Sequence, residues 1–337
     1  MSLDAASPWR HRSASNWPRR YHHYRCIRTN AQKGVPLTDS HAELGPIRIG
    51  AVLPQIELPP DPDAIRRYVE HLERHGYTHL LAYDHVLGAS TSSRPGWTGS
   101  YSSIDPFLEV LTAFSWAAGF TERIELVTGV LILPQRQTAL VAKQAATLDM
   151  LSGGRLRLGV GIGWNKVEYD GLNETFHNRG KRMEEQIELM RALWMEPVIT
   201  FEGRWHRIDD AGILPLPHQR PIPVWIGGSA EVAIRRAARI ADGFFPQGVP
   251  GEQMDGMMSA LFDELDRVGR DRATFGIDAR ITVSSDGPDE WRRQAVSWRE
   301  MGATHISLNT MKGGFTEIDQ HLDALDRGRD AIREAIG

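Results

Sequence analysis

Short apolar runs alternate with helical patterns from Ile47 to the C-terminus, and this alternation is the strongest constraint on the fold. Eight runs have the length and composition of buried strands. They are 47–53, 78–83, 124–131, 156–160, 222–226, 243–245, 276–283 and 304–308. Because strands that alternate with helices form parallel sheets, the chain is predicted to be an α/β protein.

Helical patterns occupy the segments between these runs. Asp61 is expected to cap the first helix, Pro62 to lie in its first turn and Gly76 to end it. Later helices are expected at 139–151, 180–194, 230–241, 252–268, 289–301 and 318–336. Eight such units within residues 47–337 fit a closed (β/α)8 TIM barrel better than an open doubly wound sheet.

Two segments depart from this pattern. Residues 198–208 resemble a hairpin with its turn at Glu202-Gly203, and we interpret them as a small insertion packed on the barrel. Residues 1–46 hold few aliphatic residues, and the first forty carry seven basic and two acidic residues. We therefore predict a basic, disordered N-terminal extension, followed by a single domain from 47 to 337.

Composition excludes several classes of protein. The longest apolar stretch, 126–134, is under ten residues and is interrupted by Thr128 and Gly129, whereas a membrane helix needs about twenty. A net charge of −4 is too balanced to imply a nucleic-acid surface. A single cysteine, Cys26, excludes an internal disulfide framework and a Cys-rich zinc site. We expect a cytoplasmic protein without nucleic-acid or membrane partners.

Barrel active sites form at the C-terminal ends of the strands, which directs attention to Asp84-His85 after the second run. A histidine beside a carboxylate at this rim is suited to donate or accept a proton near neutral pH. The alternative is a buried histidine whose ring is satisfied by hydrogen bonds.

Two glycine-rich segments follow strands. Gly161 and Gly163 lie in GVGIGW, which lacks the third glycine of a dinucleotide fingerprint, so we favour a loop that lets a flat or phosphorylated ligand approach the backbone. Gly227 and Gly228 precede Ser229, and the N–H groups of the helix that follows favour an anion such as phosphate. The alternative is a plain βα turn with Ser229 as N-cap.

His71 and His75 lie four residues apart on the first predicted helix, with Glu73 between them. The order H-x-E-x-H is not that of zinc proteases, and the helix belongs to the outer ring of the barrel. We interpret this as a solvated helix face and predict no metal site.

Read in order, these segments resemble the luciferase-like flavin and deazaflavin oxidoreductases, especially their F420-dependent actinobacterial branch. The matching text includes IRIGAVLPQ from Ile47, LLAYDHV from Leu80, LSGGRLRLGVGIGW from Leu151 and IGGS with DGFFP further on. The resemblance covers essentially 47–337 and is most specific between 124 and 246. It implies the luciferase-like form of the barrel.

The resemblance also implies roles for individual residues. It places a non-prolyl cis peptide at Gly129-Val130, behind a deazaflavin bound in the barrel mouth. Asp84 would lie near the ring of the cofactor, and His85 would face the substrate. The remaining cofactor-binding residues would be Gly161, Gly163, Trp164, Ile226, Gly227, Gly228 and Ser229. The cationic pocket of the sugar-phosphate-oxidising relatives is not identifiable in this sequence.

The implied activity is a coenzyme F420-dependent oxidoreductase that transfers a hydride between C5 of the deazaflavin and a small organic substrate, with His85 as proton donor or acceptor. The main alternative is an FMNH2-dependent two-component monooxygenase, which would need a separate reductase. A third is a non-catalytic flavin-binding protein on the same fold. Relatives are often dimers, so a homodimer is a possible assembly.

Overall fold

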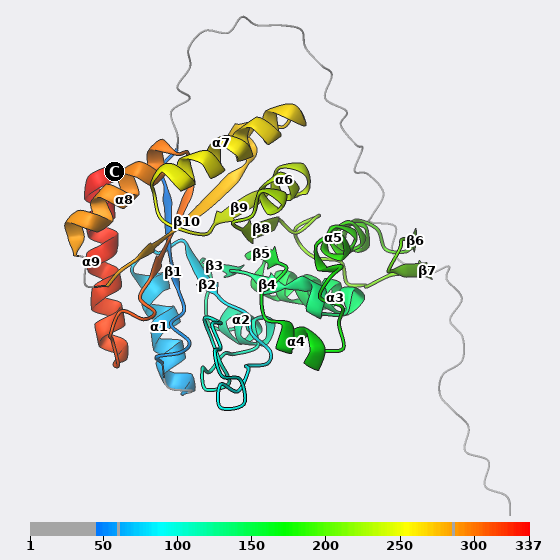
Figure 1. The fold of residues 1–337 in the computed structure, drawn as a ribbon, viewed down its shortest axis with the longest axis horizontal. Helices are drawn as coiled ribbons and strands as arrows, with labels where there is room; N and C mark the ends of the chain where they lie inside the picture. Colours follow the sequence, from blue (N-terminus) through cyan, green and yellow to red (C-terminus); the bar gives the residue numbers. More distant parts are fainter. Residues whose placement is uncertain (1–44, 59–60, 285–286) are drawn as a thin grey trace, which may run out of the picture. The chain divides into compact units, whose positions relative to one another are not determined.

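Eight parallel strand positions form a closed ring in the computed structural model, which describes residues 45–58, 61–284 and 287–337. The strand order is β3-β2-β1-β11-β10-β9-β8-β5-β4, and β3 also pairs with β5, which closes the sheet on itself. The ring with its surrounding helices is visible in Figure 1. The predicted TIM barrel is therefore confirmed. The predicted extension over 1–46 lies almost entirely outside the described residues.

The barrel strands are β1 (Arg48–Val52), β2 (His79–Ala82), β3 (Glu125–Thr128) continued by β4 (Leu131–Ile132), β5 (Leu156–Gly161), β8 (Val224–Gly228), β9 (Gly243–Pro246), β10 (Gly276–Thr282) and β11 (His305–Asn309). Each of the eight predicted runs overlaps its strand, and several strands extend one or two residues beyond the predicted end. The third run is divided because β3 and β4 pair separately with β5 on either side of Gly129-Val130.

The helices are α1 (Pro62–Arg74), α2 (Val110–Ala118), α3 (Thr138–Ser152), α4 (Lys166–Gly171), α5 (Arg179–Met195), α6 (Glu231–Ile240), α7 (Glu252–Arg267), α8 (Pro288–Glu300) and α9 (Ile318–Ile336), with 3-10 turns η1 (Leu133–Gln135) and η2 (Arg272–Thr274). Asp61 caps α1 as predicted, accepting a hydrogen bond from the N–H of Asp63. The sequence did not predict α2, whose segment VLTAFSWAA is almost wholly apolar and therefore has no polar face to give a period.

The predicted insertion is an antiparallel hairpin of β6 (Ile199–Glu202) and β7 (Arg207–Ala211). It extends three residues beyond the predicted end at 208. The carboxylate of Glu185 in α5 fastens its turn, accepting hydrogen bonds from the N–H groups of Arg204, Trp205 and His206. The hairpin therefore packs on the outside of the barrel.

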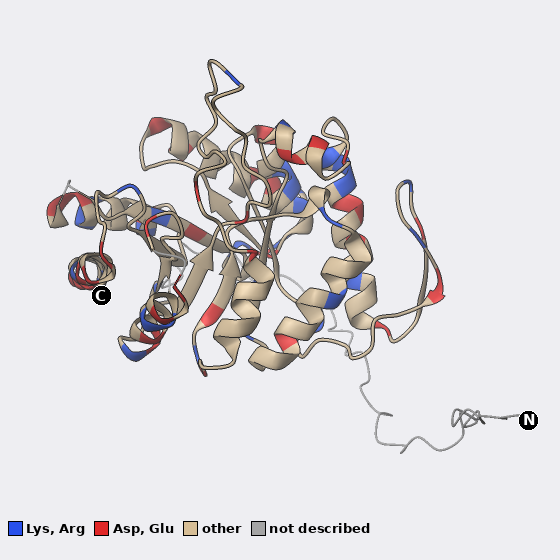
Figure 2. Cartoon of the chain, turned by 90° about the horizontal axis from the view of Figure 1, so that it is seen from below, with Lys and Arg blue, Asp and Glu red and all other residues tan. Residues whose placement is uncertain are grey.

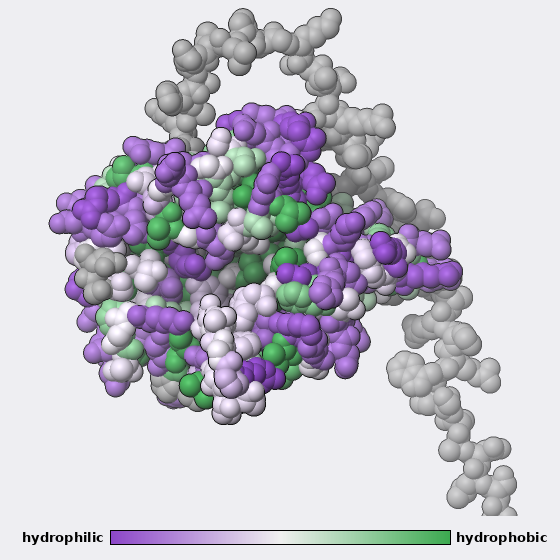
Figure 3. All heavy atoms as spheres, in the orientation of Figure 1, coloured by the Kyte–Doolittle hydropathy of each residue, from purple (hydrophilic) through white to green (hydrophobic). Residues whose placement is uncertain are grey.

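Surface charge is mixed over the described residues. Basic and acidic residues are interspersed along the helices (Figure 2). In the space-filling view, hydrophilic residues dominate, and apolar residues gather toward the centre of the face shown (Figure 3). Within the described part of the chain, every helix is too short or too polar to cross a membrane.

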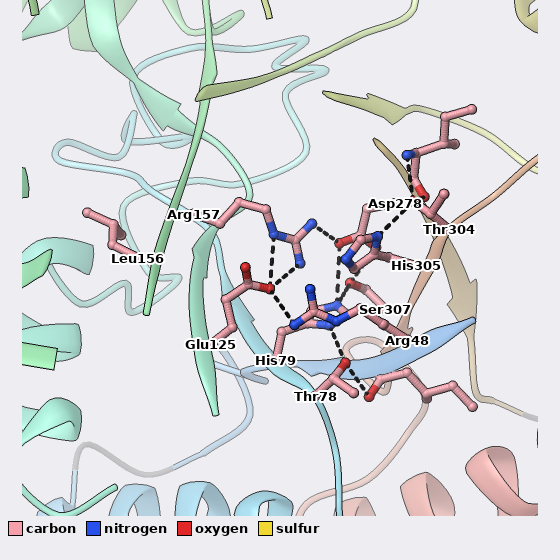
Figure 4. Close-up of polar contacts among 12 residues, drawn as sticks. Arg48, Thr78, His79, Glu125, Leu156, Arg157, Asp278, Thr304, His305 and Ser307 are labelled. Atoms are coloured by element: carbon pink, nitrogen blue, oxygen red, sulfur yellow. Dashed lines mark hydrogen bonds and ion pairs between the residues drawn. The ribbon is translucent and has the colours of Figure 1, made fainter. Parts of the chain in front are cut away.

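A cluster of buried polar residues fills the end of the barrel where the strands begin (Figure 4). Arg157 donates a hydrogen bond to Asp278 at 2.9 Å and forms an ion pair with Glu125 at 3.0 Å. Ser307 donates to Asp278 at 2.8 Å, and His79 lies 3.3 Å from the same carboxylate. Arg157 and Asp278 are almost completely buried at this end of the barrel, whereas the cavity described below lies at the opposite end.

Candidate active site

A cavity of about 580 Å³ opens at the C-terminal ends of the strands. Ten of the predicted site residues line it: Asp84, His85, Gly129, Val130, Gly161, Gly163, Trp164, Gly227, Gly228 and Ser229. Ile226 does not, because its side chain is fully buried between the sheet and the helices, where alternation along β8 directs it. The structure thus brings together nearly all the predicted residues from four separate segments.

The Gly129-Val130 peptide is cis, as the resemblance implies. The Val130 side chain lies against two glycine backbones of neighbouring strands. A Cβ atom at Gly161 would lie 2.5 Å from Val130 Cγ2, and one at Gly227 would lie 2.9 Å from Val130 Cγ1. These two glycines therefore make room for Val130 in the wall of the cavity, a role that the sequence analysis did not assign to them.

Asp84 lies at the wall of the cavity, and its carboxylate is buried. It accepts a hydrogen bond from the N–H of Ile132 at 3.0 Å and another from Arg136 at 2.7 Å. Burial raises the pKa of Asp84, and the charge of Arg136 opposes that rise. The carboxylate thus holds the segment after Val130 in place.

His85 is paired with Glu168 rather than with Asp84. Its Nδ1 atom lies 3.4 Å from Glu168 Oε2, whereas the carboxylate of Asp84 has the partners described above. The sequence analysis paired His85 with the adjacent carboxylate, but consecutive residues of an extended segment point in opposite directions. Glu168 comes from α4, more than eighty residues later in the chain.

Three further contacts fix the position of Glu168. Its Oε1 atom accepts hydrogen bonds from the N–H groups of Val86 and Leu87, and its Oε2 atom accepts one from Gln135 at 3.3 Å. Burial alone would raise the pKa of Glu168, but the hydrogen bonds from His85, Val86 and Leu87 bring it below its usual value. Glu168 is therefore ionised at every pH at which a histidine side chain titrates.

Aromatic side chains surround the His85 ring. The ring centroids of Tyr101, Phe107 and Trp164 lie 5.2, 4.8 and 5.8 Å from it. His85 and Tyr101 also line a second cavity of about 270 Å³, and Asp105 and Asn165 are among its other lining residues. The imidazole thus stands between the main cavity and a smaller polar one.

The N-terminus of α6 faces the main cavity, because Gly228, Ser229 and Ala230 all line it. The alternative sequence interpretation, with Ser229 as the N-cap, is wrong. The N-cap is Ala230, and no side chain caps the helix. The first N–H groups of α6 therefore have no side-chain partner and are suited to an anion.

The sequence analysis missed two cationic side chains of the cavity, Arg280 and Lys312. Arg280 donates a hydrogen bond to the Tyr83 hydroxyl at 3.0 Å, and Lys312 Nζ lies 4.8 Å from the centre of the Tyr101 ring. Asp278, Arg280 and Thr282 alternate with buried aliphatic residues along β10, and that period-two pattern could have identified Arg280 as facing the barrel interior.

This cavity fits a flavin or a deazaflavin. Its volume lies in the range typical of small-molecule sites, and the glycines on its walls leave backbone accessible to a flat ring. The uncapped α6 N-terminus and Arg280 add positive potential for a phosphate.

Comparison with known proteins agrees with this arrangement. The sequence model of a family described as luciferase-like monooxygenase matches residues 41–335. An F420-dependent glucose-6-phosphate dehydrogenase of Segniliparus rotundus is 33% identical over 68% of this chain and 67% of its own length. An FMNH2-dependent dimethylsulfone monooxygenase of Pseudomonas putida is 30% identical over 56% of this chain and 49% of its own length. The chain thus spans about two thirds or less of these relatives.

A crystal structure of a monooxygenase from Streptomyces bottropensis superimposes with a TM-score of 0.71. It is 20% identical to this chain and covers 86% of this chain and 100% of its own. At that identity the superposition shows a shared fold.

Proposed function

Since the chain belongs to the luciferase-like monooxygenase family, we propose that it is a coenzyme F420-dependent oxidoreductase acting on a small organic substrate. One observation carries the proposal: His85, paired with a buried carboxylate, lines a glycine-walled cavity at the open end of the barrel. A protein that only stores a cofactor has no need of such a pair.

The cofactor would be held by residues already described. Val130 would support one face of the ring, and Gly161 and Gly163 would leave space along its edge. Gly228, Ser229 and the first N–H groups of α6 would bind the phosphate. When bound, the deazaflavin supplies hydride transfer at its C5 atom.

His85 would manage the proton of the reaction. With Glu168 accepting a hydrogen bond from Nδ1–H, the lone pair of Nε2 is free to accept the proton of a substrate hydroxyl. In the reverse direction the imidazolium, stabilised by Glu168, donates that proton. Tyr101, Phe107 and Trp164 exclude water around the ring and favour an apolar substrate body.

The second candidate is an FMNH2-dependent monooxygenase, which the similarity to the Pseudomonas putida enzyme favours. Calorimetric titration of the full chain with F420 and with FMN, each oxidised and reduced, separates the two. We expect micromolar or tighter binding of F420 and weaker binding of FMN. Preferential binding of reduced FMN would overturn the proposal in favour of the monooxygenase, and binding of neither would overturn both.

A catalytic role is tested by His85→Ala in the same preparation. It should keep the affinity for F420 and lose most turnover across a panel of alcohols and activated alkenes or imines. If wild-type protein binds F420 but reduces or oxidises none of the panel, a non-catalytic flavin-binding protein becomes the better description.

A further inference from the structure

His71, His75 and Asp326 form a cluster on the outer surface of the barrel, between the first helix and the last. His71 lies near the end of α1, His75 is its C-cap, and Asp326 lies in the middle of α9. One potential ligand atom from each residue lies within 4.8 Å of the other two. No third ligand for the two histidines could be identified from the sequence, because Asp326 is some 250 residues away in the chain.

The two histidines are arranged as a pair. Their rings stack with centroids 3.8 Å apart and planes 19° apart, which is the arrangement expected of side chains four residues apart on a helix. His75 is exposed, and its Nδ1 atom lies 2.8 Å from the carbonyl oxygen of His71. That carbonyl can only accept, so Nδ1 carries the proton and the Nε2 lone pair is available.

The carboxylate of Asp326 is already oriented toward the pair. Its Oδ2 atom lies 3.0 Å from His71 Nε2. The Tyr77 hydroxyl donates to Oδ1 at 3.1 Å, and Arg329 lies 3.0 Å from the same oxygen. Carboxylates that ligate metals are typically held by such outer contacts, which leave one oxygen free for the ion.

We propose that His71, His75 and Asp326 bind a divalent transition metal ion of the zinc class. Two imidazole nitrogens and one carboxylate oxygen are ligands that Zn²⁺ accepts, with water in the fourth position on the exposed side of His75. Zn–N and Zn–O bonds of about 2.0–2.2 Å place tetrahedral ligand atoms roughly 3.4 Å apart. The Nε2–Oδ2 pair needs only a small separation to reach that spacing. The exposed His75 ring would have to turn out of its stack on His71 and exchange its Nδ1 hydrogen bond for the metal contact.

The charges around the cluster bear on affinity. Arg74 and Arg329 are cationic, and Asp330, which pairs with Arg329, offsets one of them. The ion would replace the hydrogen bond between His71 and Asp326 with two coordinate bonds.

The site would act on stability rather than on the reaction. The cluster lies next to Tyr77, just before β2 begins, whereas the main cavity lies at the ends of the strands. An ion there would join α1 to α9, which follow the paired strands β1 and β11 at the two ends of the barrel's chain. Binding to the folded form alone raises the unfolding temperature with metal concentration.

The test uses the full chain, freed of metal with EDTA and titrated with ZnCl2 by calorimetry and by thermal unfolding. We expect micromolar binding and a rise in unfolding temperature, with MgCl2 having neither effect because imidazole is a poor ligand for Mg²⁺. His75→Ala and Asp326→Asn should each weaken zinc binding by about tenfold or more. Exposed His177→Ala is the matched control and should bind zinc like the wild type.

His75→Ala keeps the His71–Asp326 contact, so it leaves the fold intact. If this variant binds zinc and is stabilised by it as strongly as the wild type, the ion binds elsewhere and the proposal is wrong. An unfolding temperature unaffected by zinc in the wild type would overturn it equally. Neither outcome depends on the identity of the cofactor.

Discussion

His85 Nδ1 lies 3.4 Å from Glu168 Oε2, although the two residues belong to different β/α units of the barrel. The pairing fixes which ring nitrogen faces the cavities and supplies a counter-charge for the protonated ring. Glu168 is thus a positioning residue for the proposed reaction.

Glu168→Gln should reduce turnover about a hundredfold while leaving cofactor affinity within twofold, because the amide presents N–H to Nδ1 and imposes the wrong tautomer. Parallel kinetics and calorimetry check this. Asp170→Asn, an exposed change on the same helix, is the control and should be silent. Equal losses of binding and turnover in Glu168→Gln would point to a collapsed α4 instead.

The contact between Val130 and Gly161 predicts a coupled pair of substitutions. Gly161→Ala places a methyl group 2.5 Å from Val130 Cγ2 and should lower the free energy of unfolding by about 1–3 kcal/mol. Val130→Ala removes the obstructing methyl groups, so the double variant should recover most of that loss. Denaturant unfolding of the four proteins measures the coupling, and strictly additive effects would show that the two side chains do not compete for space.

Ser229→Asp tests the anion site without adding bulk to the barrel wall. The side chain is exposed, and an acidic residue before α6 does not harm the helix. It should weaken binding of the phosphorylated cofactor by about tenfold, because two negative charges meet at the helix N-terminus. Ser229→Asn has nearly the same shape without the charge and should bind almost normally. Equal affinity in both variants would move the phosphate to another part of the cavity.

The polar cluster at the end of the barrel where the strands begin predicts acid sensitivity. Burial lowers the pKa of His305 from 6.5 to about 2, so between these values the unfolded chain binds a proton that the native state does not. Stability therefore falls as the pH falls below about 6.5, with a slope approaching 1.4 kcal/mol per pH unit.

His305→Gln should make the dependence between pH 6 and pH 4 shallower by about that slope. Denaturant titrations at several pH values give the comparison. Asp278 adds to the loss below pH 4: burial alone would raise its pKa, but His79 and Arg157 hold it well below its usual value. An unchanged slope in His305→Gln would mean that His305 is protonated in the native state.

Most of the fold was predictable because its evidence is local. Eight apolar runs and the intervening periodic segments indicated a barrel. The rule that barrel sites lie after the strands, together with the family resemblance, selected ten of the residues that line the cavity. The helix α2 was missed for an equally local reason, since a nearly all-apolar segment has no amphipathic period. The inward orientation of Arg280 could have been predicted from the alternation of residues along β10.

The partners of those residues could not be predicted from the sequence. Asn165 followed by Glu168 is the pattern of a helix N-terminus, but nothing local states that this glutamate reaches His85. The same holds for Val130 between Gly161 and Gly227, and for Asp326 beside His71. The sequence determined the strands, most of the helices and the end of the barrel where chemistry occurs, because periodicity and strand order are properties of short segments. The tertiary structure alone decided which carboxylate faces which histidine, because closing the barrel brings together side chains that are far apart along the chain.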